Sequence, residues 1–203
     1  MTAHTFGLSD IFPGLDEVEP SIVYLMGCSS FNQFCCTLRA LDYPEDFCPF
    51  CDKERARRNR GFEARLNGWG LLKNEFPRKD TSHMWLIIPE RHVVSPQELT
   101  RRDWIGIGQM FDHCRKMLKM PGGGLIMRFG DPHYHAGTIE HLHLNMVEPL
   151  QNGNFRTPLA KTPEKHAEDY ADLLKNIAEL KRRGGEKWLL SVQGIEETQP
   201  KIA

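Results

Sequence analysis

The stretch GTIEHLHLNMVEP, residues 137–149, restricts the fold of this chain more than any other segment. It places nitrogen-bearing side chains at every second position, in His141, His143 and Asn145, with mostly apolar residues around them. Alternate side chains of a β-strand point to the same face of its sheet. We therefore expect a strand that carries two imidazoles and one amide on one face, and such a set indicates a functional site rather than core packing.

The composition is that of an ordinary soluble globular protein. The chain has 203 residues, of which 40% are hydrophobic and 26% charged, and this length suits one sizeable domain with elaborations. A formal net charge of -1 argues against a dedicated nucleic-acid-binding protein. The basic run KERARRNR (53–60) is expected to be the solvated face of a short helix. No apolar run is long enough for a membrane span and the N-terminus shows no signal pattern, so we expect no membrane partner and a cytoplasmic location.

In the cytoplasm the six cysteines would stay reduced, so they are expected to be ligands, nucleophiles or buried small residues rather than disulfides. Cys48 and Cys51 stand apart, because two intervening residues let both sulfurs reach one cation. The other four have apolar neighbours and are expected in the core: Cys28, Cys35, Cys36 and Cys114.

The motif Cys48-Pro-Phe-Cys51 has three interpretations. A structural zinc site needs two further ligands, and His92 and His141 are available on or beside expected strands. A glutaredoxin-type redox site has the same spacing, but it requires a strand–helix–strand unit with a parallel sheet, which the downstream pattern does not supply. The third interpretation is two plain core cysteines. The spacing favours zinc and leaves the other two open.

From residue 61 onward the pattern predicts an α+β fold with a mostly antiparallel sheet. The runs ARLNGWGLLKN (64–74) and HMWLIIPE (83–90) are apolar and separated by turn residues, so we expect an antiparallel pair. GLIMRF (124–129) and IEHLHLNMV (139–147) are expected to be two more strands.

A long helix is expected between these two pairs of strands. Thr100 with Asp103 resembles a helix-starting cap, and Ser95 with Glu98 is a rival start. Pro121 and the three glycines after it should end the helix. Its apolar side should carry the residues that recur at helical spacing: Trp104, Ile107, Met110, Phe111, Cys114, Met117 and Leu118.

The two ends of the chain are less regular. FNQFCCTLRAL (31–41) is read as a buried helix or strand. A second helix should start at Thr162 as its cap and stop at Gly184 and the glycine after it. KWLLSVQGI (187–195) is expected to be a last strand.

Several segments, in this order, resemble the histidine triad (HIT) superfamily: FCPFC, LLKNEFP, HMWLIIPERHV, a long helix, and a polar loop leading into HLHLN. The resemblance favours its zinc-containing branch, with similarity to galactose-1-phosphate uridylyltransferase and diadenosine tetraphosphate phosphorylase. It implies a HIT-like catalytic core over residues 45–150. We expect residues 1–44 to be an N-terminal extension packed on that core, and residues 151–203 to add a C-terminal helix and strand.

The resemblance also implies roles for single residues. The family's Zn²⁺ ligands fall on the set that spacing had suggested: Cys48, Cys51, His92 and His141. The histidine that attacks the α-phosphorus and carries the nucleotide falls on His143. The ribose-binding residue falls on Asn74, Arg128 replaces an expected Asn before the phosphate loop, and Thr138 takes the place of a hydroxyl residue that touches phosphate.

The polar loop DPHYHAGT adds two histidines that the resemblance does not explain, His133 and His135. They are candidates for binding substrate phosphate or a second metal, and the alternative is that they are exposed loop residues. A homodimer through the long helix is a further expectation, in which Trp104, Met110 and Phe111 would serve either the interface or the core.

Asn145 stands where hydrolytic members of the superfamily carry a third histidine. A histidine can donate a proton to a leaving group or help activate water, whereas an amide does not titrate and only donates a hydrogen bond. We therefore expect a zinc-stabilised nucleotidyltransferase or phosphorylase that works through a nucleotidyl-His143 intermediate. Its substrate would be a pyrophosphate-linked nucleotide, namely a dinucleoside polyphosphate or a nucleotide sugar. The alternatives are a nucleotide hydrolase and a non-catalytic nucleotide-binding protein.

Overall fold

A computed structural model of the chain describes residues 25–26, 28, 30–42, 48–51, 55, 61–130, 139, 141–153, 155–157 and 163–191. This part of the chain contains a five-stranded sheet of order β1-β2-β3-β5-β4, in which every pair is antiparallel. The strands are β1 (Ala64–Leu66), β2 (Trp69–Lys73), β3 (Thr81–Pro89), β4 (Gly124–Met127) and β5 (Leu144–Pro149). The helices are α2 (Phe31–Asp42), the 3-10 helix η2 (Pro96–Glu98), α5 (Arg101–Met117), α6 (Pro163–Arg183) and α7 (Gly185–Ser191). The predicted α+β class with an antiparallel sheet is confirmed.

The run 64–74 forms two strands instead of the single strand that was expected. Asn67 and Gly68 have φ values of 52° and 81°, so both central residues of the turn are left-handed. This is the backbone of a two-residue hairpin turn, and Asn-Gly is its preferred sequence. The prediction was wrong because the dipeptide was read as the interior of a strand, whereas it reverses the chain and pairs Leu66 with Trp69.

Both predicted starts of the long helix are used, one after the other. The Ser95 side chain caps η2 and the Thr100 side chain caps α5, each in a reciprocal capping box with the acidic residue three positions later. α5 ends at Met117, before the expected stop at Pro121, because Lys119 adopts a left-handed φ of 52°.

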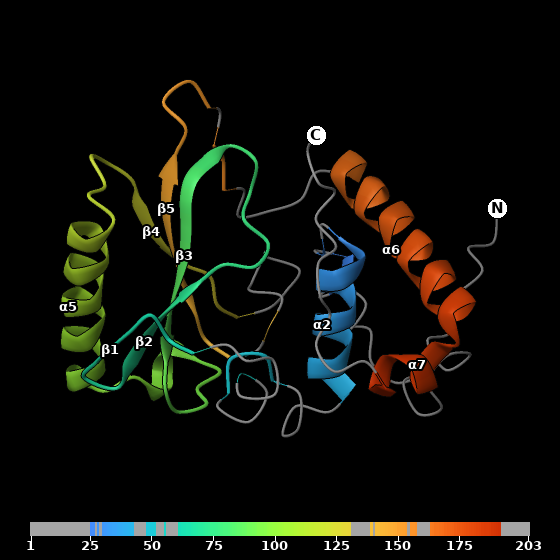
Figure 1. Cartoon of the computed structure of the whole chain (residues 1–203), viewed down its shortest axis with the longest axis horizontal. Coiled ribbons are helices and arrows are strands. Elements are labelled where there is room, and N and C mark those ends of the chain that lie inside the picture. Colours follow the sequence, from blue (N-terminus) through green and yellow to red (C-terminus); the bar gives the residue numbers. More distant parts are fainter. Residues whose placement is uncertain are drawn as a thin grey trace.

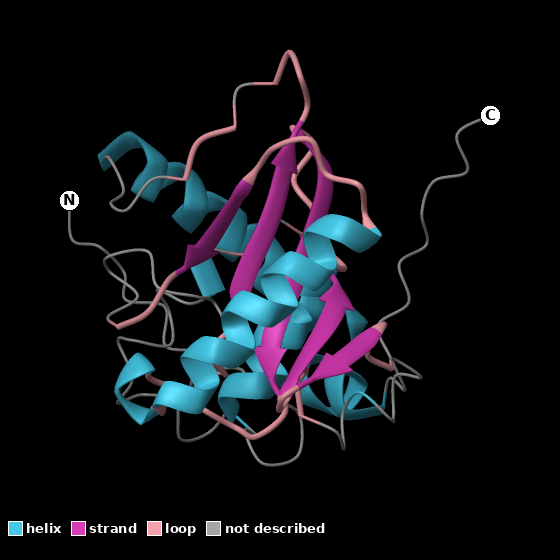
Figure 2. Ribbon diagram, turned by 90° about the vertical axis from the view of Figure 1, so that its left-hand side faces the viewer, coloured by secondary structure: helices cyan, strands magenta, loops and turns pink. Residues whose placement is uncertain are grey.

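α5 covers one face of the sheet (Figures 1 and 2). At Gly106 the helix approaches β2 so closely that a Cβ would stand 2.6 Å from the Trp69 ring. Trp104, expected on the buried side, is 52% exposed, whereas Met110 is fully buried and is therefore core rather than interface. The buried cluster between α5 and the sheet comprises Trp69, Leu71, Ile87, Ile107, Met110, Cys114, Met120, Leu144 and Met146.

The helices α2, α6 and α7 form a separate apolar cluster on the other side of the sheet from α5 (Figure 1). The segment 31–41, for which helix and strand were both open, is a helix, and α6 ends at Arg183 next to Gly184, as expected. The predicted last strand is wrong, because Gly185–Ser191 is a helix. In this helix the Trp188 ring centroid lies 5.9 Å from that of Phe31. A short helix after the Gly184 turn brings that ring and Leu189 back onto α2 and α6, and this packing overrides the strand-like composition.

The four cysteines expected in the core are buried, which confirms that prediction: Cys28, Cys35, Cys36 and Cys114. Thr162, the expected cap of α6, lies outside the described residues. None of the described helices combines the length and apolar content that a bilayer crossing needs.

Candidate active site and metal centre

Only the last two residues of the HLHLN segment belong to the sheet. β5 begins at Leu144, which pairs with Ile87 of β3 and Met127 of β4, so Asn145 lies in the strand but His141 and His143 precede it. The expected strand is therefore too long at this end, because both neighbouring ladders stop at Leu144. The segment before β5 is still anchored to the loop that follows β3, since the Leu142 N–H donates to the Val93 carbonyl at 2.6 Å.

The site lies on the sheet face opposite α5. Leu144 and Met146 belong to the cluster under α5, so the intervening Asn145 points to the other face. Asn145 pairs with Leu86 on one side and Ile126 on the other. All three nitrogen-bearing residues are buried: His141 at 0%, His143 at 8% and Asn145 at 6% exposure.

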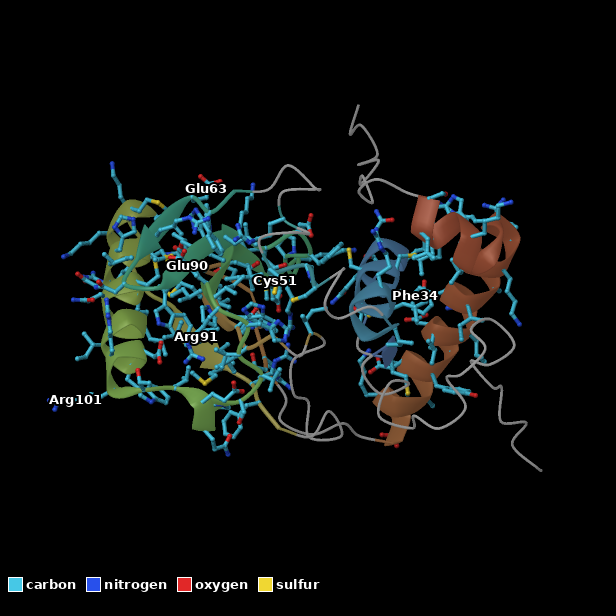
Figure 3. The ribbon with its side chains drawn as sticks, turned by 90° about the horizontal axis from the view of Figure 1, so that it is seen from below. Phe34, Cys51, Glu63, Glu90, Arg91 and Arg101 are labelled. Carbon is cyan, nitrogen blue, oxygen red and sulfur yellow. The ribbon has the colours of Figure 1, made fainter. Side chains whose placement is uncertain are left out.

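The residues expected to bind metal lie together, with one ligand atom from each and all of these atoms within 4.8 Å of one another. They are Cys48, Cys51, His92 and His141. Cys51 lies on the side of the sheet that faces α2, away from α5 and Arg101 (Figure 3). The main chain already brings the two cysteines together, because the Cys51 N–H donates to the Cys48 carbonyl at 3.1 Å.

The separations within this cluster fit zinc. His141 Nδ1 lies 3.4 Å from Cys48 Sγ and 3.5 Å from Cys51 Sγ, and His92 Nδ1 lies 3.3 Å from Cys51 Sγ. A tetrahedral zinc ion with bonds of about 2.3 Å to sulfur and about 2.0 Å to nitrogen would set such edges at about 3.5 Å. The cluster could hold a metal ion, and its two sulfurs and two nitrogens are a donor set that zinc prefers.

The protein orients the His141 imidazole and anchors the loop that carries His92. The Nε2–H of His141 donates to the Pro89 carbonyl at 3.0 Å, which leaves Nδ1 with a free lone pair toward the sulfurs. His92 follows Arg91, whose guanidinium binds the Asp103 carboxylate at 3.1 Å and the Glu98 carbonyl at 2.9 Å. The loop that carries His92 is thereby tied to the start of α5.

The cluster also stabilises a thiolate. A hydrogen bond from the Cys48 thiol lowers the pKa of Cys51 to about 4, and the contacts with His141 and His92 act in the same direction, whereas the bond to Cys51 and burial raise the pKa of Cys48. A thiolate at Cys51 is the form that binds a metal. The redox interpretation requires a parallel strand–helix–strand unit, and the strands that the structure describes pair only antiparallel.

His143 is held in one tautomer. Its Nδ1–H donates to the His141 carbonyl at 2.9 Å, so Nε2 keeps a lone pair. Burial lowers the pKa of His143 to about 4, and the positive charge of Arg128 acts in the same direction. The Phe50 ring packs edge-on against this imidazole, with 5.1 Å between the two ring centroids. His143 is therefore a neutral imidazole with one nitrogen available for chemistry.

Two polar groups beside His143, the Arg128 guanidinium and the Asn145 amide, have no partner among the described residues. Arg128 directly follows β4, and both burial and the nearby charge of Arg78 lower its pKa. Within the described residues, neither the Arg128 guanidinium nor the Asn145 amide makes a hydrogen bond or an ion pair. Such groups are costly to bury unless a ligand satisfies them, and an anion would satisfy both.

The other expected substrate-binding residues are only partly visible. Asn74 follows β2, and its side-chain oxygen accepts the Phe76 N–H at 2.8 Å, which leaves the amide NH₂ for a ligand. Thr138, His133 and His135 lie outside the described residues.

Sequence reasoning missed Arg55, which belongs to the basic run that was expected to be solvated. Arg55 is only 3% exposed; its Nε donates to the Phe50 carbonyl at 3.0 Å and its guanidinium lies 3.7 Å from the Phe62 ring centroid. The sequence signal was the spacing, because Arg55 stands four residues after Cys51, one turn along a helix that starts at the motif. In the structure the Arg55 N–H donates to the Cys51 carbonyl, as that spacing requires. Arg55 thus fixes the loop that presses Phe50 onto His143.

A scan against protein-family models and a search of curated proteins find no match to this chain. Solved histidine triad structures do resemble it. A HIT family hydrolase from Clostridium thermocellum has 22% identity and a TM-score of 0.44, covering 54% of this chain and 96% of its own. A histidine triad nucleotide-binding protein from Sulfolobus tokodaii has 20% identity and a TM-score of 0.41, covering 68% and 97%. A zinc-bound histidine triad protein from Mycobacterium smegmatis has 18% identity and a TM-score of 0.39, covering 65% and 96%.

Proposed function

We propose that this chain takes a nucleotide from a pyrophosphate-linked donor onto the Nε2 atom of His143, and then passes it to an acceptor. The observation that carries the proposal is the hydrogen bond from His143 Nδ1 to the His141 carbonyl, which leaves Nε2 as the only available nucleophilic nitrogen of this ring. A neutral imidazole is nucleophilic, and its product with a phosphoryl group is reactive enough to turn over.

In the first half-reaction the Nε2 lone pair attacks the α-phosphorus, a P–N bond forms, and the P–O bond to the leaving phosphate breaks. The electron pair of that bond stays on the leaving oxygen, which needs no proton because phosphate is a stable anion. Arg128 and the Asn145 amide would stabilise charge on the non-bridging oxygens. This role explains why their donors have no partner in the described structure.

In the second half-reaction an acceptor oxygen attacks the phosphorus and the P–N bond breaks. A phosphate acceptor is already an anion, whereas water must lose a proton, and Asn145 cannot take it. We therefore favour a nucleotidyltransferase or phosphorylase, with a dinucleoside polyphosphate or nucleotide sugar as donor. A hydrolase would use the same covalent intermediate, and a non-catalytic nucleotide-binding protein would use the same pocket, so both remain alternatives.

Zn²⁺ bound by Cys48, Cys51, His92 and His141 would cross-link three loops and would not meet the substrate. Its effect on the reaction is indirect, since the His141 carbonyl is the group that orients His143. The Asn74 amide would bind the ribose, and Thr138, His133 and His135 would contact phosphate. A homodimer, a cytoplasmic location and the division at residues 44 and 150 are part of the same proposal.

The test is intact mass spectrometry of the protein and of His143→Ala after incubation with dinucleoside polyphosphates and nucleotide sugars, under alkaline conditions that preserve P–N bonds. We expect an added nucleoside monophosphate that is absent from the variant, and its mass identifies the nucleoside. Loss of the adduct on adding phosphate or a sugar phosphate, but not in buffer alone, supports a transferase; loss in buffer supports a hydrolase. Nucleotide binding without any adduct would support the non-catalytic alternative.

A further inference from the structure

The sheet leaves a hollow where β4 begins beside the end of β5. The pairing of these strands stops at Gly124 and Val147, and β5 continues for two further residues that β4 does not reach. The chain enters β4 through Pro121 and two glycines, which have no side chains to fill this space. A cavity of about 970 Å³ remains, and its volume is in the range of pockets that hold small organic molecules.

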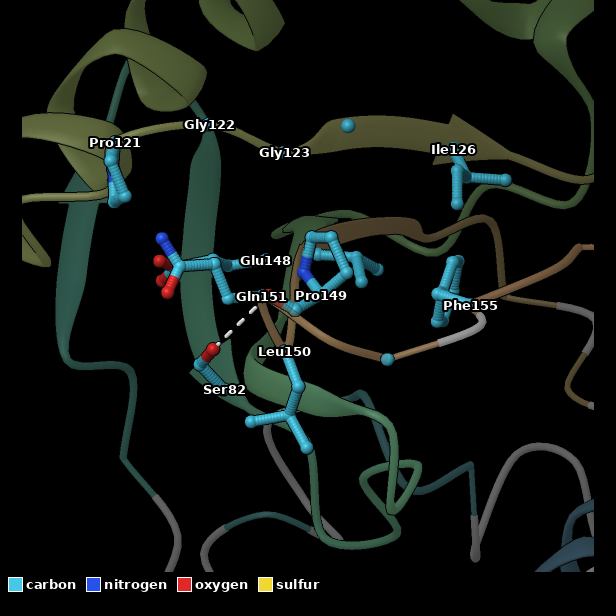
Figure 4. A pocket seen from close by; sticks show the side chains of 13 residues that line it. Ser82, Pro121, Gly122, Gly123, Ile126, Glu148, Pro149, Leu150, Gln151 and Phe155 are labelled. Atoms are coloured by element: carbon cyan, nitrogen blue, oxygen red, sulfur yellow. Dashed lines mark hydrogen bonds between the residues drawn. The ribbon is translucent and has the colours of Figure 1, made fainter.

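This cavity has a polar end and an apolar end. Glu148 and Gln151 lie at one end of it, whereas Ile126 and Phe155 lie at the other (Figure 4). Glu148 is the only ionisable side chain among the described residues that line the cavity. Most of the remaining wall is apolar and comes from Pro121, Ile126, Val147, Pro149, Leu150 and Phe155. The cavity thus offers one negative charge beside an apolar surface.

The Glu148 carboxylate is held in place but is only partly satisfied. The Nδ1–H of His83 donates to its Oε2 atom at 2.6 Å across the β3–β5 ladder, and the Glu148 side chain is only 13% exposed. Its Oε1 atom has no polar partner among the residues that the structure describes. A carboxylate withdrawn from water in this way is stabilised by a donor that a ligand supplies.

The chemistry of this wall selects an organic cation. An anion would be repelled by Glu148, and no arginine or lysine stands among the described lining residues to offset that charge. Arg78, which does not line the cavity, lies 4.6 Å from the Phe155 ring centroid and is paired with Asp80 at 3.2 Å. A metal ion needs several ligands, and within the described ranges only the candidate metal centre groups three or more of them. An ammonium group on a hydrocarbon body matches both ends of the cavity.

We propose that this cavity is a second binding site, for a small primary amine with an aliphatic body. The ammonium group donates to Glu148 Oε1 and to the side-chain oxygen of Gln151. The hydrocarbon part lies toward Ile126 and Phe155, where it is withdrawn from water.

This site is separate from the one that contains His143. Glu148 stands four residues along β5 from Leu144, which is about 13 Å in a strand. The ammonium group therefore lies far from His143, and the inference does not depend on the proposed function.

The experiment is isothermal titration calorimetry of the full chain with n-butylamine, n-hexylamine and n-octylamine, and with the alcohol and the carboxylate of each length. The amines should bind about threefold to fourfold more tightly for each added methylene. The alcohol of the same length should bind at least about 10-fold more weakly, because it lacks the charge-assisted hydrogen bond, and the carboxylate should not bind.

Two variants test the charge and the space separately. Glu148→Gln removes the charge but keeps an acceptor for His83, so it should erase the preference for amine over alcohol. Gly124→Leu fills the cavity, since a Cβ there meets no atom within 4 Å, and should weaken hexylamine and octylamine binding at least about 10-fold. The matched controls are Glu63→Gln, at an exposed glutamate outside the cavity, and Gly108→Leu, at a glycine with equally open surroundings on the exposed side of α5. Neither control should alter binding.

Equal affinity for the amine, alcohol and carboxylate of one length would overturn the inference, as would no amine binding up to millimolar concentrations. A preference for amines that survives in Glu148→Gln, or undiminished binding in Gly124→Leu, would place the amine elsewhere on the protein and overturn it as well. If circular dichroism shows that Glu148→Gln does not fold, Gly124→Leu and the comparison of amines with alcohols still decide.

Discussion

The Nδ1–H of His143 donates to the carbonyl oxygen of His141 at 2.9 Å, so the backbone of a candidate metal ligand sets the tautomer of the candidate nucleophile. The His141 side chain is fixed in turn, because its Nε2–H donates to the Pro89 carbonyl at 3.0 Å. Metal binding and nucleophile orientation are therefore coupled through one residue, without contact between metal and substrate.

Loss of the metal should destabilise the protein and misplace His143. Cys48→Ser is expected to abolish stoichiometric zinc binding and to lower the Tm by about 10 °C or more, because the unfolded chain has no such site and the free energy of metal binding therefore adds to that of folding. Metal analysis and thermal unfolding check this result. Cys35→Ala is the matched control, since it removes an equally buried thiol from the helical cluster and should leave the zinc content at one per chain.

Asn145→His should change the fate of the intermediate. The imidazole can accept a proton from water, so hydrolysis of the nucleotidyl adduct should become about 100-fold faster while adduct formation persists. Decay of the isolated adduct in buffer measures the rate. Asn152→His makes the same change in the exposed turn after β5 and should have no effect. An unchanged decay rate in Asn145→His would mean that proton transfer at this position does not limit hydrolysis.

Arg55→Gln should weaken the loop that carries the two cysteines and Phe50. The guanidinium is buried against Phe62 and bonds the Phe50 carbonyl, so we expect a loss of about 2–3 kcal/mol in the free energy of unfolding and slower adduct formation. Chemical denaturation and single-turnover kinetics measure the two effects. Arg65→Gln is the control, because Arg65 lies 4.9 Å from the same ring but is half exposed. Similar losses in both variants would contradict the assigned role of Arg55.

The cap of α5 predicts a pH-dependent contribution to stability. Burial alone would raise the pKa of Asp103, but hydrogen bonds from Thr100 and Arg91 outweigh it and hold the pKa below the ordinary 3.8. A lowered folded-state pKa means that the stabilisation is complete above about pH 4 and is lost as the pH falls through the folded value. Asp103→Asn should therefore cost about 1 kcal/mol at pH 7 and progressively less below pH 4. Thermal unfolding across pH measures this difference; a cost that does not vary with pH would contradict it. Asp112→Asn, on the exposed side of α5, should cost less.

Much of this architecture was predictable because its signals are local. The capping boxes at Ser95 and Thr100 each need only four consecutive residues, and both were recognised. The four candidate metal ligands could be chosen because two-residue cysteine spacing and histidines next to strands limit the choice.

What could not be predicted depends on contacts between distant segments. The helical form of residues 185–191 depends on α2, which is more than 140 residues earlier in the chain. The start of β5 at Leu144 is set by where two neighbouring strands end. Asn67-Gly68 is different: that signal is local and was read wrongly.

The most direct test of the account is the position of the P–N bond. We would form the adduct with the donor that labels the protein, keep it alkaline, and determine by ³¹P and ¹⁵N NMR which histidine nitrogen carries phosphorus. The account predicts a single phosphoramidate on Nε2 of His143, because Nδ1 is occupied by the hydrogen bond to the His141 carbonyl. Phosphorus on Nδ1 of His143, or on another histidine, would contradict it.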